Sequence, residues 1–530
     1  MTRRIVILLA CCAGLLALPA NAVADEAEPF FNPSAVAEID FTLPPASLQK
    51  LEEEPETDEY QHAEITVRIN GVTRTLADVG FRLKGGHGSF RELDGKAAFK
   101  VKFAEFVKKQ KLLGLKKLTL NNMVQDPSMV HETLTYELFR AMGLPAPRTG
   151  YASVRINGTL YGTYLNVETY DDTMLPRFFA TTQHLYEADA AGVDVRTGEA
   201  GTFEIDEGDD VDVSDLEALI EAVSDDEGDW SDNVSPFADL EEMTRAWAVE
   251  RYVAHWDGYA GTDAPFRPNN YYLHSDEAGV FATMPWGTDQ TWEPSREVEF
   301  DEPAGGLMFN RCVADASCRQ AYLEGLSEVR CTALDADAAT HATQLAAMLA
   351  AYQDDEDQAR RESSPEEIAE VLEEVESFAT ARPAELKDFL AAEGMLPDGV
   401  DPCVPPSVDP TVYQVVMPHA TEGPTASPLL KFGPTKVRGN RVTTTVEVPS
   451  AGSVTQTVAT RIDGRRVRAC SIRANPPGAG KTTLSCRLRS RVRDARTDGP
   501  LTLRVRIAFV PDGSGEPDAL RRVIAAPKHG

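Results

Sequence analysis

Beyond its first two dozen residues, the sequence lacks an apolar run of the about 20 residues that a membrane-spanning helix requires. It also lacks a Cys-x-x-Cys pair and has only 9 histidines, which disfavours a zinc site, and it lacks the Gly-x-Ser-x-Gly motif of serine hydrolases. No internal repeat and no coiled-coil pattern is present. The sequence has 42% apolar and 26% charged residues, which is typical of a globular protein. Its length of 530 residues suggests about two to four domains.

The first 24 residues are predicted to be a signal peptide. Arg3 and Arg4 provide the basic start, residues 5–18 form an apolar stretch, and the small residues at 20–24 suit cleavage. The alternative, a membrane anchor, needs a longer apolar run. We therefore expect a secreted, periplasmic or cell-surface protein with no transmembrane segment once the signal is removed.

Cysteine usage agrees with export. Six cysteines follow the signal peptide, an even number that is compatible with three disulfides in an oxidising compartment. Several connectivities are possible, and the local choice pairs Cys312 with Cys318, Cys331 with Cys403, and Cys470 with Cys486.

Positive charge is scarce overall, since the formal net charge is −32. This disfavours nucleic acid as a partner because its phosphates would be repelled. Residues 411–530 are the exception: they hold 20 Lys and Arg against 8 Asp and Glu, a net charge of +12, which leaves −44 for the rest. A basic C-terminal domain is therefore predicted, and its charge would suit contact with anionic wall polymers or with acidic partners.

Composition divides the chain after the signal peptide into four parts. An acidic lead-in at 25–60 contains one short strand, at 37–43, and a large domain spans 61–400. A Pro-rich linker follows at 401–412. Residues 413–530 alternate Val, Thr and Arg with the period of strands, which predicts a small β-sandwich.

Within the large domain, strand patterns come first and helical patterns follow. Strands are expected on both sides of the Asn70-Gly71 turn, at 80–84, at 97–103 and in a hairpin at 154–168. Helices are expected at 128–142, 216–222, 237–255, 316–328, 332–352, 365–378 and 383–393. The predicted fold class is α+β.

One spacing suggests phosphoryl-transfer chemistry. Asp257 is followed 12 residues later by Asn269 and Asn270, and Asp289 comes after a short hairpin. In such chemistry one carboxylate can orient the attacking nucleophile, while an asparagine oxygen and a second carboxylate hold Mg²⁺. By itself the spacing is weak, because Asp and Asn are also common turn residues.

Further segments occur around this spacing in a fixed order. They are LKGGHGS at 83–89, KAAFKVKF at 96–103, LGLKKLTLNN at 113–122, DPSMVHE at 126–132, MGLPAP at 142–147, INGTLYGTYLNVE at 156–168, NNYY at 269–272 and PWGTD at 285–289. No single segment is specific. Together, in this order and with Asp257, they resemble the CotH family of spore-coat-protein-H-like atypical protein kinases over roughly residues 62–300.

The resemblance implies a two-lobed, protein-kinase-like domain that binds ATP and Mg²⁺, with Mn²⁺ as an alternative ion, and phosphorylates or otherwise modifies surface or secreted proteins. It implies that Asp257 is the catalytic carboxylate and that Asn269 or Asn270 and Asp289 bind the metal. The implied ATP-binding residues are Lys84, Gly85 and Gly86 in the glycine loop, Lys96 or Lys100 at the phosphates, Glu132 as the partner of that lysine, and Glu168 near the adenine-side hinge. Lys100 could equally lie on the solvated face of a strand, and Glu132 could simply cover a helix surface.

Two positions depart from the family pattern. The family usually has Asp at the position of Gly287, so that only the second carboxylate of a Trp-Asp-x-Asp pattern remains here, as Asp289. If the missing carboxylate is the essential metal ligand, the protein is a weak enzyme or a non-catalytic relative. Lys84 stands where the family often has Arg, which keeps the charge but loses the planar fork.

Other interpretations remain open. A non-catalytic, kinase-like protein of surface assembly or adhesion is the main alternative, and a carbohydrate-active enzyme is a third, although nothing in the sequence is specific for sugars. Gly478-Ala-Gly-Lys-Thr-Thr483 resembles the end of a P-loop, but Asn475 stands where that motif needs Gly. The acidic run at 206–215 lacks the central glycine and final glutamate of an EF-hand loop.

Overall fold

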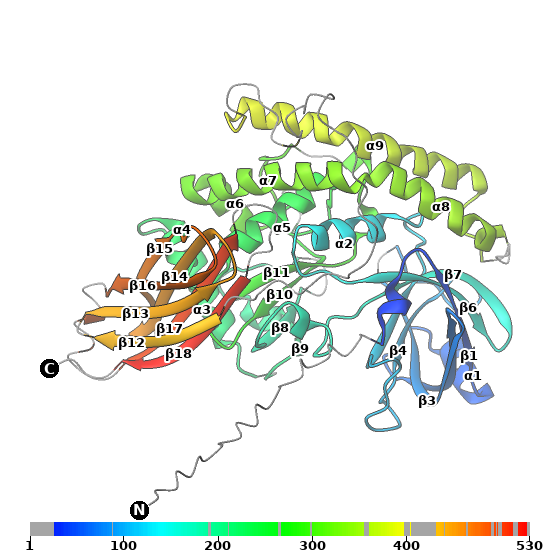
Figure 1. The fold of residues 1–530 in the computed structure, drawn as a ribbon. Coiled ribbons are helices and arrows are strands. Elements are labelled where there is room, and N and C mark those ends of the chain that lie inside the picture. The colour runs from blue at the N-terminus through cyan, green and yellow to red at the C-terminus, as the bar shows by residue number, and fades with distance from the viewer. Residues whose placement is uncertain are drawn as a thin grey trace, which may run out of the picture.

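The computed structural model describes residues 26–86, 88–188, 192–209, 211–262, 267–296, 299–354, 360–396 and 403, together with parts of the C-terminal region between 431 and 526. The predicted signal peptide and nearly all of the predicted linker lie outside the described residues. None of the helices in the described ranges combines the length and the hydropathy that crossing a bilayer requires. The predicted α+β class is confirmed (Figure 1).

A closed barrel forms the first part of the large domain, drawn in blue and cyan in Figure 1. The strand order is β1-β2-β3-β4-β5-β7-β6, and the barrel closes where β1 and β6 run parallel. The strands are β1 Val36–Thr42, β2 Gln61–Ile69, β3 Val72–Lys84, β4 Ala98–Lys102, β5 Lys117–Asn121, β6 Thr149–Ile156 and β7 Thr159–Val167. A helix, α1 Pro45–Glu53, connects β1 to β2.

Alternating side chains fill this barrel. Phe41, Phe81 and Phe99 meet inside it, with ring centroids 4.8 Å apart for the first pair and 5.0 Å for the second. Because side chains alternate along a strand, Lys84 and Lys100 lie on the outer face. The strand predicted in the acidic lead-in is β1, and its pairing with both β2 and β6 makes it a member of the barrel.

A second hydrophobic core lies beside the barrel and is built from α2, a four-stranded sheet and the later helices. The sheet has the order β11-β10-β8-β9, from β8 His184–Glu187, β9 Glu204–Glu207, β10 Tyr271–Ser275 and β11 Phe281–Pro285. The helices are α2 His131–Ala141, α3 Ser214–Ser224, α4 Trp230–Val234, α5 Leu240–Tyr252, α6 Leu307–Ala314, α7 Ala316–Ala336, α8 Ala338–Asp354 and α9 Pro365–Ala392. Short 3-10 turns include η1 Glu28–Phe31, η2 Leu175–Arg177, η3 Ala200–Thr202, η4 Thr288–Gln290 and η5 Pro294–Arg296.

The prediction of two helices at 365–378 and 383–393 is wrong, because α9 runs through Pro383 without a break. A proline inside a helix costs about 3 kcal/mol. Burial on both sides of it, by Phe378 and Leu386, offsets that cost. The buried Arg382 also stabilises this part of α9, because it donates hydrogen bonds to the carbonyls of Arg251 (2.9 Å) and Tyr252 (3.1 Å).

The C-terminal strands form two sheets over one shared core. One sheet has the order β12-β13-β16 and the other β15-β14-β17-β18. The strands are β12 Lys431–Arg438, β13 Arg441–Val448, β14 Gly452–Ile462, β15 Arg465–Ala474, β16 Gly480–Arg487, β17 Leu501–Pro511 and β18 Asp518–Ala526. Lys481, of the P-loop-like segment, lies in β16, paired with Glu447.

All three predicted disulfides are confirmed. Cys312–Cys318 joins α6 to α7, and Cys331–Cys403 joins α7 to the beginning of the predicted linker. Cys470–Cys486 joins β15 to β16 and so links the two C-terminal sheets.

Candidate functional site

A lysine and a glutamate from different elements meet through an asparagine. Lys84, the last residue of β3, donates to Asn121 Oδ1 at the end of β5. Asn121 Nδ2 in turn donates to Glu132 Oε2 on α2 at 2.8 Å. The barrel and the helix are thus joined by a continuous Lys84–Asn121–Glu132 chain. We expected Lys96 or Lys100 to be the partner of Glu132, but the lysine that Asn121 joins to it is Lys84.

Asp289 in η4 belongs to the same cluster. Burial and the nearby carboxylates of Glu132 and Asp126 raise the pKa of Asp289 to about 7, while Lys84 opposes the shift. Burial and the repulsion of Lys100 lower the pKa of Lys84 to about 8, while Glu132 and Asp289 oppose that shift. Burial also raises the pKa of Glu132. The cluster therefore holds more negative than positive groups in a poorly solvated place.

The N-terminus of α2 is fixed against this cluster. The Asp126 carboxylate accepts from the backbone N–H groups of Met129 (3.0 Å) and His131 (2.8 Å), and the second of these is one of the first N–H groups of α2, which have no partner within the helix. The ring Nδ1 of His131 donates to the backbone carbonyl of Asp289 at 2.7 Å. Helix α2 therefore positions both Glu132 and the backbone that carries Asp289.

Asp257 and the two asparagines converge as the sequence predicts. Asp257 follows α5, and its Oδ2 accepts from Asn270 Nδ2 at 2.8 Å and from Asn269 Nδ2 at 3.4 Å. Asn270 Nδ2 also donates to the carbonyl of Gly287 at 3.3 Å, two residues before Asp289. Burial raises the pKa of Asp257, and the hydrogen bond from Asn269 opposes this rise. Asn270 thus connects the Asp257 loop to the Asp289 segment.

Gly287, at which the sequence departs from the pattern expected from the resemblance, lies against this asparagine. Its backbone is left-handed, with φ 52° and ψ 49°. A Cβ at this position would lie 2.6 Å from Asn270 Cγ. In this structure the Asn270 amide therefore takes up the space in which a residue 287 side chain would begin.

Replacing Gly287 by Ala is expected to destabilise the protein by about 1–3 kcal/mol, because the new methyl group adds left-handed strain and a clash with Asn270. Denaturant unfolding measures the effect. Gly201→Ala is the matched control, since a Cβ there meets nothing within 4 Å, and it should stay within about 0.5 kcal/mol of wild type. Equal stability of the two variants would contradict this account of Gly287.

Two buried groups support the Asp257 loop from behind. Glu250, on α5, accepts from the backbone N–H of Ala260 at 2.5 Å. His255 is fully buried, and burial lowers its pKa to about 4, so its ring is neutral. Gly258 passes so close to both that a Cβ there would lie 2.4 Å from His255 Nδ1. These contacts fix the backbone on either side of Asp257.

Glu250 is expected to make stability depend on pH. Burial raises its pKa to about 7 from a usual 4.5, so the folded state holds a proton that the unfolded state has released. The free energy of unfolding should therefore fall as pH rises from about 4.5 to 7, by at most about 3 kcal/mol from this group. Glu250→Gln should remove that part of the slope in denaturant titrations at several pH values. Glu241→Gln, exposed on the same helix, should leave the slope unchanged.

The glycine loop follows Lys84 directly. Gly85 has φ 133°, and a Cβ there would lie 2.8 Å from Phe90 Cα, so this position requires glycine. Gly86 donates its N–H to Ser89 Oγ at 3.1 Å. Lys100 lies near Lys84, as their mutual repulsion shows. These residues place two ammonium groups at one end of a glycine-containing turn.

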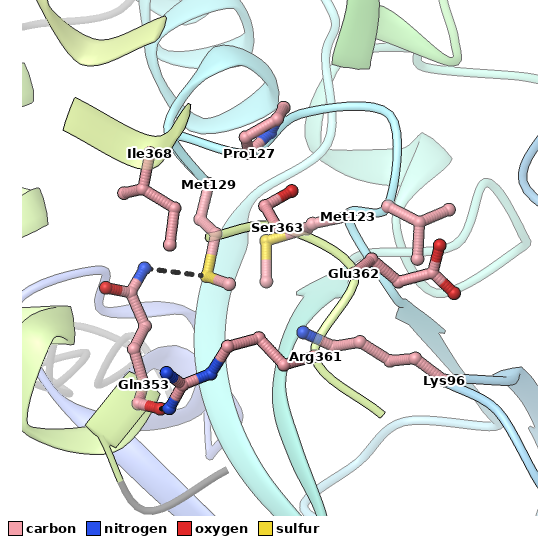
Figure 2. A pocket seen from close by; sticks show the side chains of 10 residues that line it. Lys96, Met123, Pro127, Met129, Gln353, Arg361, Glu362, Ser363 and Ile368 are labelled. Atoms are coloured by element: carbon pink, nitrogen blue, oxygen red, sulfur yellow. Dashed lines mark hydrogen bonds between the residues drawn. The ribbon is translucent and has the colours of Figure 1, made fainter. Parts of the chain in front are cut away.

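Lys96 and Glu168 contact other residues than those of the Lys84–Asn121–Glu132 cluster. Lys96 lines a pocket between the α8–α9 connection and the loop before α2, where Arg361, Glu362 and Met129 also lie (Figure 2). Glu168 is buried, and its carboxylate accepts from Arg148 Nη2 at 2.8 Å and from Arg177. Their assignment to phosphate and adenine contacts stays a prediction.

Two neighbours of the cluster were not singled out from the sequence. Asn121 ends β5, and an asparagine at a strand end gives no sign in the sequence of the groups that it will connect. Glu187, on β8, is close enough to Lys100 to feel its charge, and burial raises the pKa of Glu187 to about 7. Only the tertiary approach of β8 to the barrel brings Glu187 there.

Within the described residues, no group of three or more His, Cys, Asp or Glu side chains is arranged to hold a metal ion. The site therefore offers at most a pair of such ligands together with amide oxygens. Mg²⁺ commonly binds to one or two protein carboxylates and completes its coordination with phosphates and water.

Comparisons with known proteins show the family of this chain. The family model for "CotH kinase protein" matches residues 81–386, more than half of the chain. The inner spore coat protein H of Bacillus subtilis (strain 168) is 24% identical over 242 residues, which cover 42% of this chain and 60% of that protein. An inner spore coat protein H-like protein of the same strain is 41% identical over 59 residues, 11% of this chain and 19% of that protein.

A solved structure of a protein from Archaeoglobus fulgidus aligns with 19% of this chain and 94% of that protein's chain, at 14% identity and a TM-score of 0.13. This score is too low to support a common fold. Of the two Bacillus subtilis coat proteins, the matched segments span at most 60% of the length. The family match ends well beyond the resemblance expected from the sequence, at 386 rather than near 300.

Proposed function

Because this chain belongs to the CotH kinase protein family, we propose that it is an exported, ATP- and Mg²⁺-dependent phosphotransferase that modifies surface or secreted proteins. The observation that carries the proposal is the set formed by Lys84, Glu132, Asp257, Asn270 and Asp289. Protein kinases use a strand lysine, a helix glutamate, a catalytic aspartate, an asparagine and a second aspartate for phosphoryl transfer. Coat proteins among the relatives and three disulfides support export.

The two hydrophobic cores would serve as the two lobes of a kinase-like domain. Lys84 and the glycine loop come from the barrel, whereas Asp257 and Asp289 come from the second core. Lys84 would bind nucleotide phosphates, and the Asn121–Glu132 chain would hold it in place. Asn121 makes this link indirect, so Lys84 remains able to donate its other protons to a phosphate.

The donor set fits Mg²⁺. Carboxylates crowd around Asp289 and raise its pKa, which is a surplus of negative charge that a divalent cation would neutralise. Asn270 uses its nitrogen on Asp257 and Gly287, so its oxygen is the atom suited to a cation. Asn270 and Asp289 would hold the ion, with Asn269 as the alternative amide. When bound with ATP, Mg²⁺ supplies charge neutralisation at the phosphates.

Asp257 would act on the acceptor hydroxyl. Its carboxylate is oriented by Asn270 and Asn269, and the buried Glu250 and His255 support its loop. As the acceptor oxygen bonds to the γ-phosphorus, the bond to the bridging oxygen of ADP breaks, and the hydroxyl proton passes to Asp257.

Gly287 favours the alternative of an idle, kinase-like scaffold in surface assembly, since one family carboxylate is absent.

Labelled nucleotide tests the proposal. Mature protein incubated with MgCl₂ and γ-labelled ATP should transfer label to itself or to extracted surface proteins, whereas α-labelled ATP should transfer none. Label from α-labelled ATP would instead indicate transfer of AMP. Absence of transfer from either nucleotide, with Mg²⁺ or Mn²⁺, would favour the idle scaffold.

A further inference from the structure

The outer face of the sheet β12-β13-β16 gathers basic side chains. Its exposed residues include six cations and one carboxylate: Lys431, Lys436, Arg438, Arg441, Lys481, Arg487 and Glu447. The opposite face carries the buried Val442, Val446 and Leu484. The strand alternation therefore directs the cations away from the core and into solvent.

Three arginines form a straight row across this face. Arg441 pairs in register with Arg438 on one side and with Arg487 on the other. Neighbouring strands lie about 5 Å apart, and like charges placed directly opposite each other destabilise a sheet. The single carboxylate, Glu447, lies between Lys431 and Lys481, about 20 Å along the strand from the arginine row. A sheet face selected only for stability would alternate the signs of its charges.

The rest of the face is hydroxylic. Thr443, Thr445, Thr483 and Ser485 lie between the arginine row and the row formed by Lys431, Glu447 and Lys481, and Lys436 pairs with Thr443. None of the large hydrophobic side chains that the described residues expose lies in this domain. Protein interfaces are centred on aromatic and aliphatic side chains, and readers of single-stranded nucleic acid stack bases on aromatic rings. Charge and hydroxyl groups without such side chains instead suit an anionic polymer.

We propose that this basic face binds a linear anionic polymer of the cell envelope that carries phosphodiester groups. Arginine forks match phosphate oxygens in a bidentate way, and a row of them can bind successive phosphates. The large negative charge elsewhere in the chain is screened beyond about 8–10 Å at physiological salt, so the face acts locally. The role is one of anchoring and is independent of phosphotransfer.

Binding of the full mature chain to immobilised poly(glycerol phosphate) tests this. Wild type should bind at 50 mM NaCl and weaken steeply at 200 mM. Arg438→Ser/Arg441→Ser/Arg487→Ser should bind at least about tenfold more weakly, with a salt slope shallower by about 2, since each phosphate contact contributes about 0.7 on a flexible strand. Lys436→Ser/Lys481→Ser, on the same face, should also weaken binding.

The matched control is Lys108→Ser/Lys109→Ser/Lys111→Ser, which removes the same charge from exposed positions on the barrel domain. It should bind like wild type. Equal weakening of this control and the arginine variant would overturn the proposal, because net charge would then explain the binding. Failure of wild type to bind at 50 mM NaCl, or equally tight binding of poly-L-glutamate, would also overturn it, the latter in favour of an acidic protein partner. The arginine variant should unfold close to the wild-type temperature, since the relief of repulsion within the arginine row offsets the loss of the long hydrogen bond from Arg441 to the Ser485 carbonyl (3.4 Å).

Discussion

Replacing Asp257 by Asn is expected to lower the rate of ATP-dependent transfer by about 10²–10⁴-fold, the usual contribution of a positioned general base. An asparagine at 257 can still accept from Asn270 and Asn269 through its oxygen, so the loop should keep its shape. It has no basic oxygen for the acceptor proton. The proposed nucleotide contacts come from other residues, so the KM for ATP should change little while kcat falls.

The control for this variant is Asp78→Asn, an exposed aspartate of the barrel with no place in the site. It should transfer label at the wild-type rate. An Asp257→Asn protein that retains full activity would remove Asp257 from the chemistry, whereas a rise in KM without a fall in kcat would make it a binding residue.

The second large effect is expected for Asp289→Asn. A saturating ligand present at 100 times its Kd stabilises a protein by about 2.7 kcal/mol, which thermal unfolding with Mg·ATP would register for wild type. The variant should lose most of this shift, because it lacks the carboxylate proposed to hold the ion. Without nucleotide it should be at least as stable as wild type near pH 8, since burial and the neighbouring carboxylates disfavour the charge of Asp289.

Two controls test whether the loss of stabilisation in Asp289→Asn reflects binding of Mg·ATP. ATP with excess EDTA should shift wild type much less than Mg·ATP does, and Gly201→Ala should respond like wild type. An Asp289→Asn protein that is stabilised by Mg·ATP as much as wild type would place the nucleotide elsewhere. Wild type that shows no shift at millimolar Mg·ATP would support the idle scaffold.

Local sequence patterns were sufficient to predict an element of structure where one local interaction dominates. The alternation from 63 to 69 gave β2, and Gly143 ended α2 because glycine adopts the φ of 69° found there. The nearest-neighbour pairing of cysteines also held. Pro383 shows the opposite case, since contacts from α5 and the buried Phe378 outweigh a local signal that normally ends a helix.

By itself, the sequence determined the family and the α+β class, because these follow from residues that occur in a fixed order and from local periodicity. For the six cysteines it left several connectivities open, and for Asp257, Asn269 and Asn270 it gave only a spacing; the structure shows which of these residues pair. Tertiary structure alone decided that Lys84, rather than Lys96 or Lys100, is joined to Glu132 through Asn121, and that Asn270 takes the space beside Gly287. Such pairings depend on how β3, β5, α2 and η4 approach one another. That approach is set by the packing of two separate hydrophobic cores, which no short stretch of sequence encodes.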